Sequence, residues 1–258
     1  MLQGKGVSMS EVIKVIGLCK ENILFDINFS MKKGEMVAVM GPSGSGKSTM
    51  LYMLSGMDRA DRGQVIFDGG NICEYSEDMR AEKRLNNMGF VFQQMNMLSN
   101  LNIIDNIILP ALQNQKTKKE NRKSEVQLKK EASALMNKVG IAGLENREIT
   151  EVSGGQLQRA CICRAIINQP ELLLADEPTG ALNKAASEEI MEEFVKLNRE
   201  GTSILIVTHD SRVASRCDRV AYMTDGQISG EFVLGKYEES KKQERESMLN
   251  IWLERSGW

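Results

Sequence analysis

Apolar and polar residues alternate near the start of the chain. Between positions 23 and 30 every second residue is large and apolar, and a period of two puts alternate side chains on opposite faces of a strand. The pattern predicts a strand with one buried face, which carries Ile23, Phe25, Ile27 and Phe29. An earlier strand is expected over residues 11–17.

Short, nearly continuous apolar runs follow and predict strands that are buried on both faces. They occupy residues 35–40, 89–93, 172–176 and 203–208. Helical patterns lie between them, at about 47–56, 100–150 and 184–200. Alternation of strands with helices is typical of a parallel sheet in an α/β protein, so we expect that fold class.

Composition excludes several classes of protein. The chain has 258 residues, 41% of them apolar and 26% charged, with a net charge of −2, which gives no bulk attraction to nucleic acid. No apolar run reaches the roughly 18–20 residues that a membrane span needs, and residues 1–10 lack the apolar core of a signal peptide. Five cysteines without a C-x-x-C pair favour neither a disulfide framework nor a zinc site. We therefore expect a cytoplasmic protein.

The turn after the strand at 35–40 carries a phosphate-binding motif. Residues 41–48 read Gly-Pro-Ser-Gly-Ser-Gly-Lys-Ser and fit G-x-x-x-x-G-K-[ST] at every fixed position. Glycines let backbone N–H groups curl around an anion, and the following helix directs its N-terminus at the phosphates. Lys47 should reach the β- and γ-phosphates, and the hydroxyl of Ser48 should bind Mg²⁺. Kinases, GTPases, helicases and transporters all use this loop.

Two carboxylates end the apolar strand at 172–176. Ligands bind at the carboxyl ends of parallel strands, so Asp176 suits a carboxylate that holds Mg²⁺, and Glu177 suits a general base for the attacking water. The alternative for this pair is a solvated turn. Some twenty residues earlier, Ser153-Gly154-Gly155-Gln156 opens a helix and is a second candidate anion site.

The order and spacing of these motifs resemble the ATP-binding cassette (ABC) family over about residues 11–230. The resemblance implies a P-loop NTPase, RecA-like α/β core with an antiparallel β-subdomain and an inserted α-helical subdomain. On that basis residues 1–235 form the cassette, with the helical subdomain at about 97–165, and residues 236–258 form a C-terminal helical tail.

The same resemblance implies the site residues. Gln93 looks like the glutamine that senses Mg²⁺ and water, and His209 like the switch histidine at the γ-phosphate. The expected catalytic residues are Glu177, His209, Gln93 and Lys47, and the expected metal-site residues are Ser48, Gln93 and Asp176. The expected nucleotide-binding residues are Gly41, Ser43, Gly44, Ser45, Gly46, Lys47, Ser48, Thr49, Gln93, Ser153, Gly154, Gly155 and Gln156. ATP would lie between residues 41–49 of one copy and 153–156 of a second.

Residues 175–183 and 89–98 resemble one branch of the family, that of macrolide export, lipoprotein release, antimicrobial-peptide resistance and the cell-division cassette. This implies an ATP-hydrolysing homodimer bound to an integral-membrane permease at the inner face of the cell membrane, with no nucleic acid. The alternative is a soluble ABC-type ATPase acting on nucleic acid or ribosomes. A single phosphate loop, an acidic pI of about 5.7 and the lack of a heptad run disfavour it.

Three features bear on details of this resemblance. The family usually has an aromatic residue near the first strands that stacks on adenine, but none precedes Phe25, so Leu18, Cys19 or Lys20 covers the base, or nothing does. Weak discrimination between ATP and GTP is therefore expected. Asn183 replaces the usual Asp of the loop that crosses the dimer interface. In the tail, Leu249, Trp252 and Leu253 are at helical spacing and predict an amphipathic helix with a role in assembly, packed on its own domain, the second copy or the permease.

Overall fold

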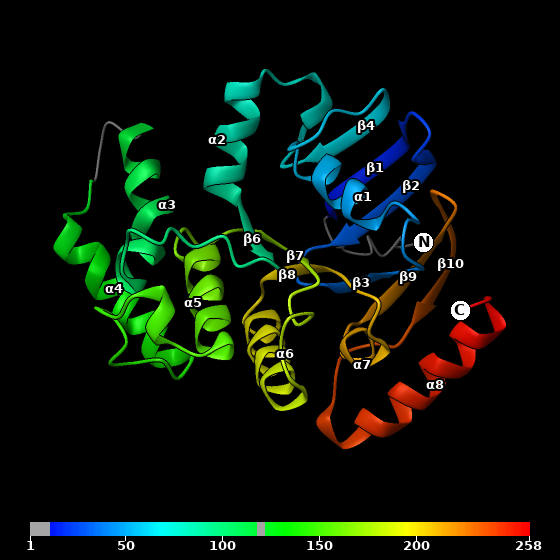
Figure 1. Cartoon of the computed structure of the whole chain (residues 1–258). Helices are drawn as coiled ribbons and strands as arrows, with labels where there is room; N and C mark the ends of the chain where they lie inside the picture. The colour runs from blue at the N-terminus through cyan, green and yellow to red at the C-terminus, as the bar shows by residue number, and fades with distance from the viewer. Residues whose placement is uncertain (1–10, 118–121) are drawn as a thin grey trace, which may run out of the picture.

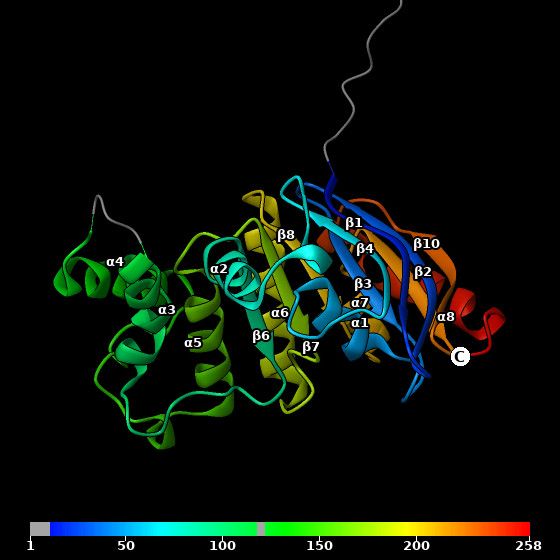
Figure 2. The same cartoon turned by 90° about the horizontal axis from the view of Figure 1, so that it is seen from above.

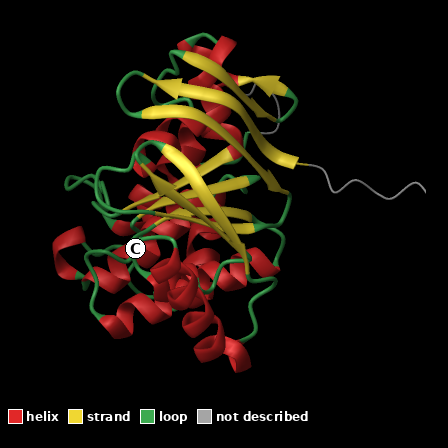
Figure 3. Cartoon of the chain, turned by 90° about the vertical axis from the view of Figure 1, so that its right-hand side faces the viewer, coloured by secondary structure: helices red, strands yellow, loops and turns green. Residues whose placement is uncertain are grey.

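The computed structural model describes residues 11–117 and 122–258, with two β-sheets and helices on both sides of the larger one (Figure 1). The segment 1–10, expected to lack a signal peptide, lies outside the described residues. Figure 3 shows the strands in two layers, with most helices below the lower layer. The α/β class predicted from the alternating strands and helices is confirmed.

The larger sheet has six strands in the order β10-β9-β3-β8-β7-β6. Its strands are β3 (Met36–Met40), β6 (Met88–Phe92), β7 (Leu172–Asp176), β8 (Ser203–Val207), β9 (Arg219–Thr224) and β10 (Gln227–Val233). Neighbours from β9 to β6 run parallel, and β10 pairs antiparallel with β9. The four apolar runs thus become β3, β6, β7 and β8, and every residue of β3 and β8 is buried, as expected for central strands.

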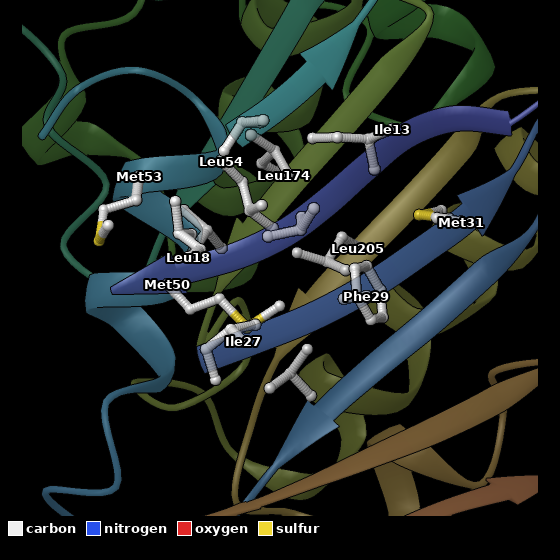
Figure 4. Packing of buried hydrophobic residues seen from close by; sticks show 14 of the residues in the cluster. Ile13, Leu18, Ile27, Phe29, Met31, Met50, Met53, Leu54, Leu174 and Leu205 are labelled. Carbon is white, nitrogen blue, oxygen red and sulfur yellow. The ribbon is translucent and has the colours of Figure 1, made fainter. Parts of the chain in front are cut away.

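The smaller sheet is antiparallel, in the order β2-β1-β4-β5. It contains β1 (Glu11–Lys20), β2 (Leu24–Lys32), β4 (Arg62–Phe67) and β5 (Gly70–Asn71). Its buried face shares a hydrophobic core with helix α1 (Lys47–Leu54) and with one face of the larger sheet. Figure 4 shows Ile13, Leu18 and Ile27 of the smaller sheet near Met50 of α1 and Leu205 of β8. This core fixes α1, and therefore the loop before it, against both sheets.

The prediction that Ile23 and Phe25 lie on the buried face is wrong. Ile23 is 39% and Phe25 46% exposed, whereas Leu24 is fully buried. The pairing of β1 with β2 shifts between Leu18↔Ile27 and Lys20↔Leu24, and Asp26 has a positive φ of 55°. One extra residue in β2 therefore forms a β-bulge that reverses which residues point inward, so only the later part of the alternation holds.

Helices cover the other face of the larger sheet. Helices α5 (Gly154–Ile166), α6 (Lys184–Arg199), α7 (Ser211–Ala214) and α8 (Lys242–Arg255) contribute to a second hydrophobic core there. The predicted tail helix is α8, and its Leu249 and Leu253 are buried. Trp252 stacks on Phe232 of β10 with ring centroids 5.3 Å apart. Of the three partners considered for the tail, α8 packs on its own domain.

Helices α3 (Ile103–Thr117) and α4 (Glu125–Lys138) pack with α5 around a third core at one end of the molecule (Figure 2). Helix α2 (Glu77–Asn87) precedes β6, and short 3₁₀ helices lie at Ile72–Glu74, Ile149–Glu151 and Glu239–Lys241. The segment expected to be helical over 100–150 is therefore mostly helix. Residues 118–121 within it lie outside the described part of the chain.

Candidate active site

The carboxyl ends of three neighbouring parallel strands meet at one cavity. The phosphate-loop motif follows β3, Glu177 follows β7, and His209 lies just beyond β8. The cavity has a volume of about 810 Å³, and its walls include Gly41–Gly44, Gly46–Thr49, Glu177 and His209. Ligands of α/β sheets bind at this end of the strands. Gly41 and His209, 168 positions apart in sequence, are thereby brought to one site.

The loop after β3 is shaped by its glycines. A Cβ atom at Gly41 would lie 2.1 Å from the carbonyl oxygen of Met223, and one at Gly46 would lie 2.6 Å from Leu24. Gly46 also has a φ of 95°, in the left-handed region that favours glycine, directly before the first residue of α1. The hydroxyl of Ser45 is buried beneath the loop with no hydrogen-bond partner among the described residues. The loop therefore presents its backbone to the cavity, as an anion site requires.

Lys47 is held against the loop that precedes it. Its Nζ donates hydrogen bonds of 2.8 Å to the carbonyl oxygens of Gly41 and Pro42, and only 9% of the residue is exposed. Burial lowers the pKa of Lys47, while the charges of Glu177 and Asp176 act in the opposite direction. The side chain thus places a cation at the wall of the cavity.

Ser48 and Asp176 form an oxygen-rich pair beside the loop. The Ser48 hydroxyl donates to Oδ1 of Asp176 at 3.0 Å, and the Tyr52 hydroxyl donates to Oδ2 at 3.2 Å. Burial, followed by the charge of Asp176, raises the pKa of Tyr52. Hydroxyl and carboxylate oxygens are the ligands that Mg²⁺ prefers, so this donor set fits that ion. Sequence reasoning missed Tyr52, although its spacing of four from Ser48 puts both on one face of α1.

Glu177 is fixed by two side chains that follow β8. Oε1 lies 2.7 Å from Nδ1 of His209, and Oε2 accepts a hydrogen bond of 3.2 Å from Thr208. The backbone N–H of Glu177 donates to Val207, and the residue has a φ of 46°. A left-handed backbone is uncommon outside glycine, and here it turns Glu177 away from the direction of Asp176. The adjacent carboxylates therefore occupy different places in the site.

Gln93 and the Ser153–Gln156 segment do not line the cavity. Gln93 follows β6, and a Cβ atom at Gly180 would lie 3.0 Å from its Nε2, so it packs against the loop after Glu177. Ser153 caps α5, and its hydroxyl accepts a hydrogen bond from the backbone of Gln156. Ser153, Gly154 and Gln156 are exposed. One copy of the chain therefore does not bring this segment to residues 41–49.

A buried glutamine supports the loop that carries Glu177. Gln158 is 1% exposed, and its Nε2 donates to the carbonyl oxygen of Pro178 at 2.7 Å. The chain position of Gln158, one turn into α5, gave no sign of this contact. It links the helix behind Ser153 to the residues just after Glu177.

The residues considered for covering the base are placed away from the cavity. Leu18 is fully buried, Cys19 accepts a hydrogen bond from the backbone of Asp26, and Lys20 pairs with Asp58 at 2.8 Å. Beyond the loop and the catalytic candidates, the cavity is lined by Ile23 and Trp258.

This arrangement defines a P-loop nucleoside triphosphatase. The profile of the ABC transporter family matches residues 24–180, and the chain belongs to that family. It is 41% identical over 224 residues to the ABC transporter ATP-binding protein YknY of Bacillus subtilis (strain 168), covering 86% of this chain and 94% of YknY. It is 39% identical to the macrolide export ATP-binding/permease protein MacB of Shewanella sp. (strain ANA-3), over 80% of this chain but only 30% of MacB.

A solved structure supports the same family. A dimeric structure of the ATP-binding cassette MJ0796, in a post-hydrolysis state bound to ADP and Pi, matches with a TM-score of 0.78 and 34% identity, covering 87% of this chain and 100% of MJ0796. The chain is thus an ATP-hydrolysing ABC cassette, with the antiparallel β-subdomain and inserted helices expected from the resemblance. Among residues 11–117 and 122–258, no helix combines the length and the apolar character that crossing a membrane requires.

Proposed function

We propose that two copies of this chain pair head to tail around two ATP molecules and drive a separate permease at the inner face of the cell membrane. The observation that carries the proposal is the split of the site. Residues 41–49, Asp176, Glu177 and His209 converge at one end of the sheet, while the largely exposed Ser153–Gln156 segment does not line their cavity. A second copy related by twofold symmetry supplies that segment to each site.

Within each site the chain's residues take distinct roles. Backbone N–H groups of the loop from Gly41 to Thr49 bind the phosphates, and Lys47 offsets their negative charge. Ser48 and Asp176 would hold Mg²⁺, with Gln93, which packs on the loop after Glu177, as the third metal residue; the ion would neutralise charge on the phosphate oxygens. Glu177 accepts the proton of the attacking water, and His209 holds the Glu177 carboxylate in place.

This chain has a cavity that is a candidate docking groove for the permease. A cavity of about 410 Å³ lies between α2, β6 and α5, lined among others by Met57, Arg84, Met88, Phe90 and Arg164. It is mostly apolar, and it adjoins the segment that leads from β6 to Gln93. An amphipathic segment of the permease fits such a groove and would sense the position of Gln93. Similarity to the macrolide export protein MacB supports export as the task.

Dimerisation is tested with the Glu177→Gln chain, in which hydrolysis should be too slow to let an ATP-bound dimer dissociate. Ser153→Arg in that background places a large cation at the segment offered to the second copy. We expect ATP to convert Glu177→Gln to a dimer in light scattering, and Glu177→Gln/Ser153→Arg to stay monomeric while still binding ATP.

The matched control is Ser124→Arg. Ser124 caps α4 with the same capping-box geometry that Ser153 has on α5, but it lies on a different part of the molecule. Glu177→Gln/Ser124→Arg should therefore dimerise with ATP. A Glu177→Gln chain that remains monomeric with ATP and Mg²⁺, with and without its permease, contradicts the proposal.

A further inference from the structure

The last residue of the chain reaches the nucleotide cavity. Trp258 lines it together with the phosphate loop, Glu177 and His209, and it is the only aromatic residue that does so among the described residues. Figure 1 shows α8 running along the β9–β10 end of the larger sheet to the C-terminus. An element outside the motifs thus supplies a wall of the site.

A defined turn at the end of α8 sets the position of Trp258. Gly257 has a φ of 87°, and the backbone N–H of Trp258 donates to the carbonyl oxygen of Leu253 at 3.0 Å. This six-residue closure with glycine in the left-handed region is a Schellman helix stop. The chain therefore leaves the helical path at Gly257, directly before Trp258.

A buried ring holds the indole from one side. The rings of Trp258 and Tyr222 meet edge to face, with centroids 6.0 Å apart and an interplanar angle of 67°. Tyr222 belongs to β9, is 1% exposed, and pairs with Met40 directly before the phosphate loop. Trp258 is nevertheless 46% exposed. One part of the indole is anchored, and another remains open to the cavity.

The cavity has walls of two chemical kinds. Backbone N–H groups and Lys47 suit the phosphates, whereas Ile23, 39% exposed, and Trp258 are the apolar walls. A nucleotide has the same division, with a charged triphosphate at one end and a flat base at the other. Aromatic side chains bind bases by stacking on their faces. Leu18, Cys19 and Lys20 contribute no wall to this cavity.

We propose that the base of the bound nucleotide stacks on Trp258, so that the C-terminal helix completes the nucleotide site of its own chain. The inference rests on the proposed ATP site and adds a specificity-determining residue to it. Stacking requires no hydrogen bond to the base edge, so Trp258 contributes affinity for any purine nucleotide.

The test separates the base from the phosphates. Calorimetry in the Ser153→Arg background, which keeps the chain monomeric, compares Mg·ATP with Mg·tripolyphosphate, a ligand that has no base. Trp258→Ala should weaken ATP binding about tenfold and leave tripolyphosphate binding unchanged, because a stacked base contributes about that factor. Trp258→Phe should retain most of the ATP affinity, since it keeps an aromatic face.

The two tryptophans provide a second measurement. Trp252 lies six residues earlier, within α8, and its ring stacks on Phe232. We expect ATP to change the intrinsic fluorescence of the Trp252→Phe chain and to leave that of the Trp258→Phe chain unchanged. Trp252→Phe is also the matched control for any loss of stability in the tail.

Other outcomes overturn the inference. An equal loss of ATP and tripolyphosphate in Trp258→Ala would mean that the residue only shapes the loop. Unchanged binding in the monomer, with weaker ATP-driven pairing in the Glu177→Gln background, would mean that Trp258 contacts the second copy. If the parent chain binds both ATP and tripolyphosphate, either result rejects the stacking role of Trp258 and leaves the proposed ATP site standing. If the parent chain binds neither ligand, the proposed ATP site fails as well.

Discussion

Nδ1 of His209 lies 2.7 Å from Oε1 of Glu177, which connects the residues that follow two adjacent parallel strands. The two partners differ in exposure, since the His209 side chain is 66% exposed and that of Glu177 only 18%. Thr208 holds the other oxygen of Glu177. The carboxylate is therefore oriented by β8 before any substrate arrives, which is the preorganisation expected of a general base.

Glu177→Gln tests the role of that carboxylate. The amide has nearly the same size and retains an oxygen that can accept from Thr208, but it cannot take a proton from water. The steady-state ATPase rate should fall by about 10²–10⁴, the usual contribution of a positioned general base. Glu192→Gln is the control, because Glu192 is an exposed glutamate of α6 and should hydrolyse at the parent rate. Parent activity in Glu177→Gln would remove Glu177 from the mechanism.

Ser48→Ala tests the metal site. The Ser48 hydroxyl donates to Oδ1 of Asp176 at 3.0 Å. Its removal therefore takes one oxygen from the metal site and leaves Oδ1 of Asp176 without this donor. The Mg²⁺ concentration for half-maximal ATPase should rise about 10–100-fold, a range typical for loss of a group that orients metal ligands. A chelator should abolish hydrolysis in both chains. Ser247→Ala, on the exposed face of α8, should titrate like the parent. Equal Mg²⁺ requirements in Ser48→Ala and the parent would contradict the assignment.

Tyr52→Phe tests whether Asp176 is positioned from α1. Loss of one hydrogen bond costs about 0.5–1.5 kcal/mol, which predicts an increase of roughly two- to twelvefold in the half-saturating Mg²⁺ concentration. The rate at saturating Mg²⁺ should stay close to that of the parent, since Tyr52 does not line the cavity. A purely structural role would lower the maximal rate or the amount of folded protein instead. Tyr75→Phe, outside the site, is the matched control.

The strands and the phosphate loop could be predicted because their signals are local. The apolar run of β3 and the glycines of residues 41–46 determine the strand and turn with little help from the rest of the chain. The error in β2 has a different origin. Its bulge at Asp26 arises from pairing with β1, so the inward-facing positions depend on a neighbour that the alternation alone does not reveal.

The site residues also divide into those that the sequence signals and those that depend on distant parts of the chain. Ser48 could be proposed from the phosphate-loop motif, Asp176 and Glu177 because ligands bind at strand ends in a parallel sheet, and His209 from the resemblance to the family. Tyr52 was missed because its partner, Asp176, is 124 residues away. Trp258 was missed because a charged tail with helical spacing says nothing about which loop its end approaches. The tail's proposed role in assembly stays a prediction, now restricted to the parts of α8 that its own domain leaves exposed.

Arg245 anchors the tail and gives a prediction for stability. The residue is 5% exposed, and its guanidinium donates to five carbonyl oxygens, those of Ser215, Cys217, Leu234, Gly235 and Lys236. Burial lowers the pKa of Arg245. Arg245→Lys keeps a cation but loses the planar fork, so several carbonyls lose their donor.

The free energy of unfolding of Arg245→Lys, from urea denaturation, should fall by about 1–3 kcal/mol. Arg255→Lys, at the exposed end of α8, should match the parent. If α8 carries Trp258 to the cavity, Arg245→Lys should also weaken ATP binding more than tripolyphosphate binding. Unchanged stability would mean that other contacts hold the tail.

ATP and GTP should be hydrolysed with values of kcat/KM that differ by less than about tenfold. Strong discrimination between purines needs buried polar groups matched to the base edge, whereas an apolar wall separates similar ligands only weakly. Ile23 offers no polar side-chain atom, and stacking on Trp258 accepts either purine. Parallel assays with saturating Mg²⁺ measure the ratio, and Trp258→Ala serves as the control because it should lower both values by a similar factor. A preference for ATP of a hundredfold or more would reveal a base-edge contact that these walls do not provide.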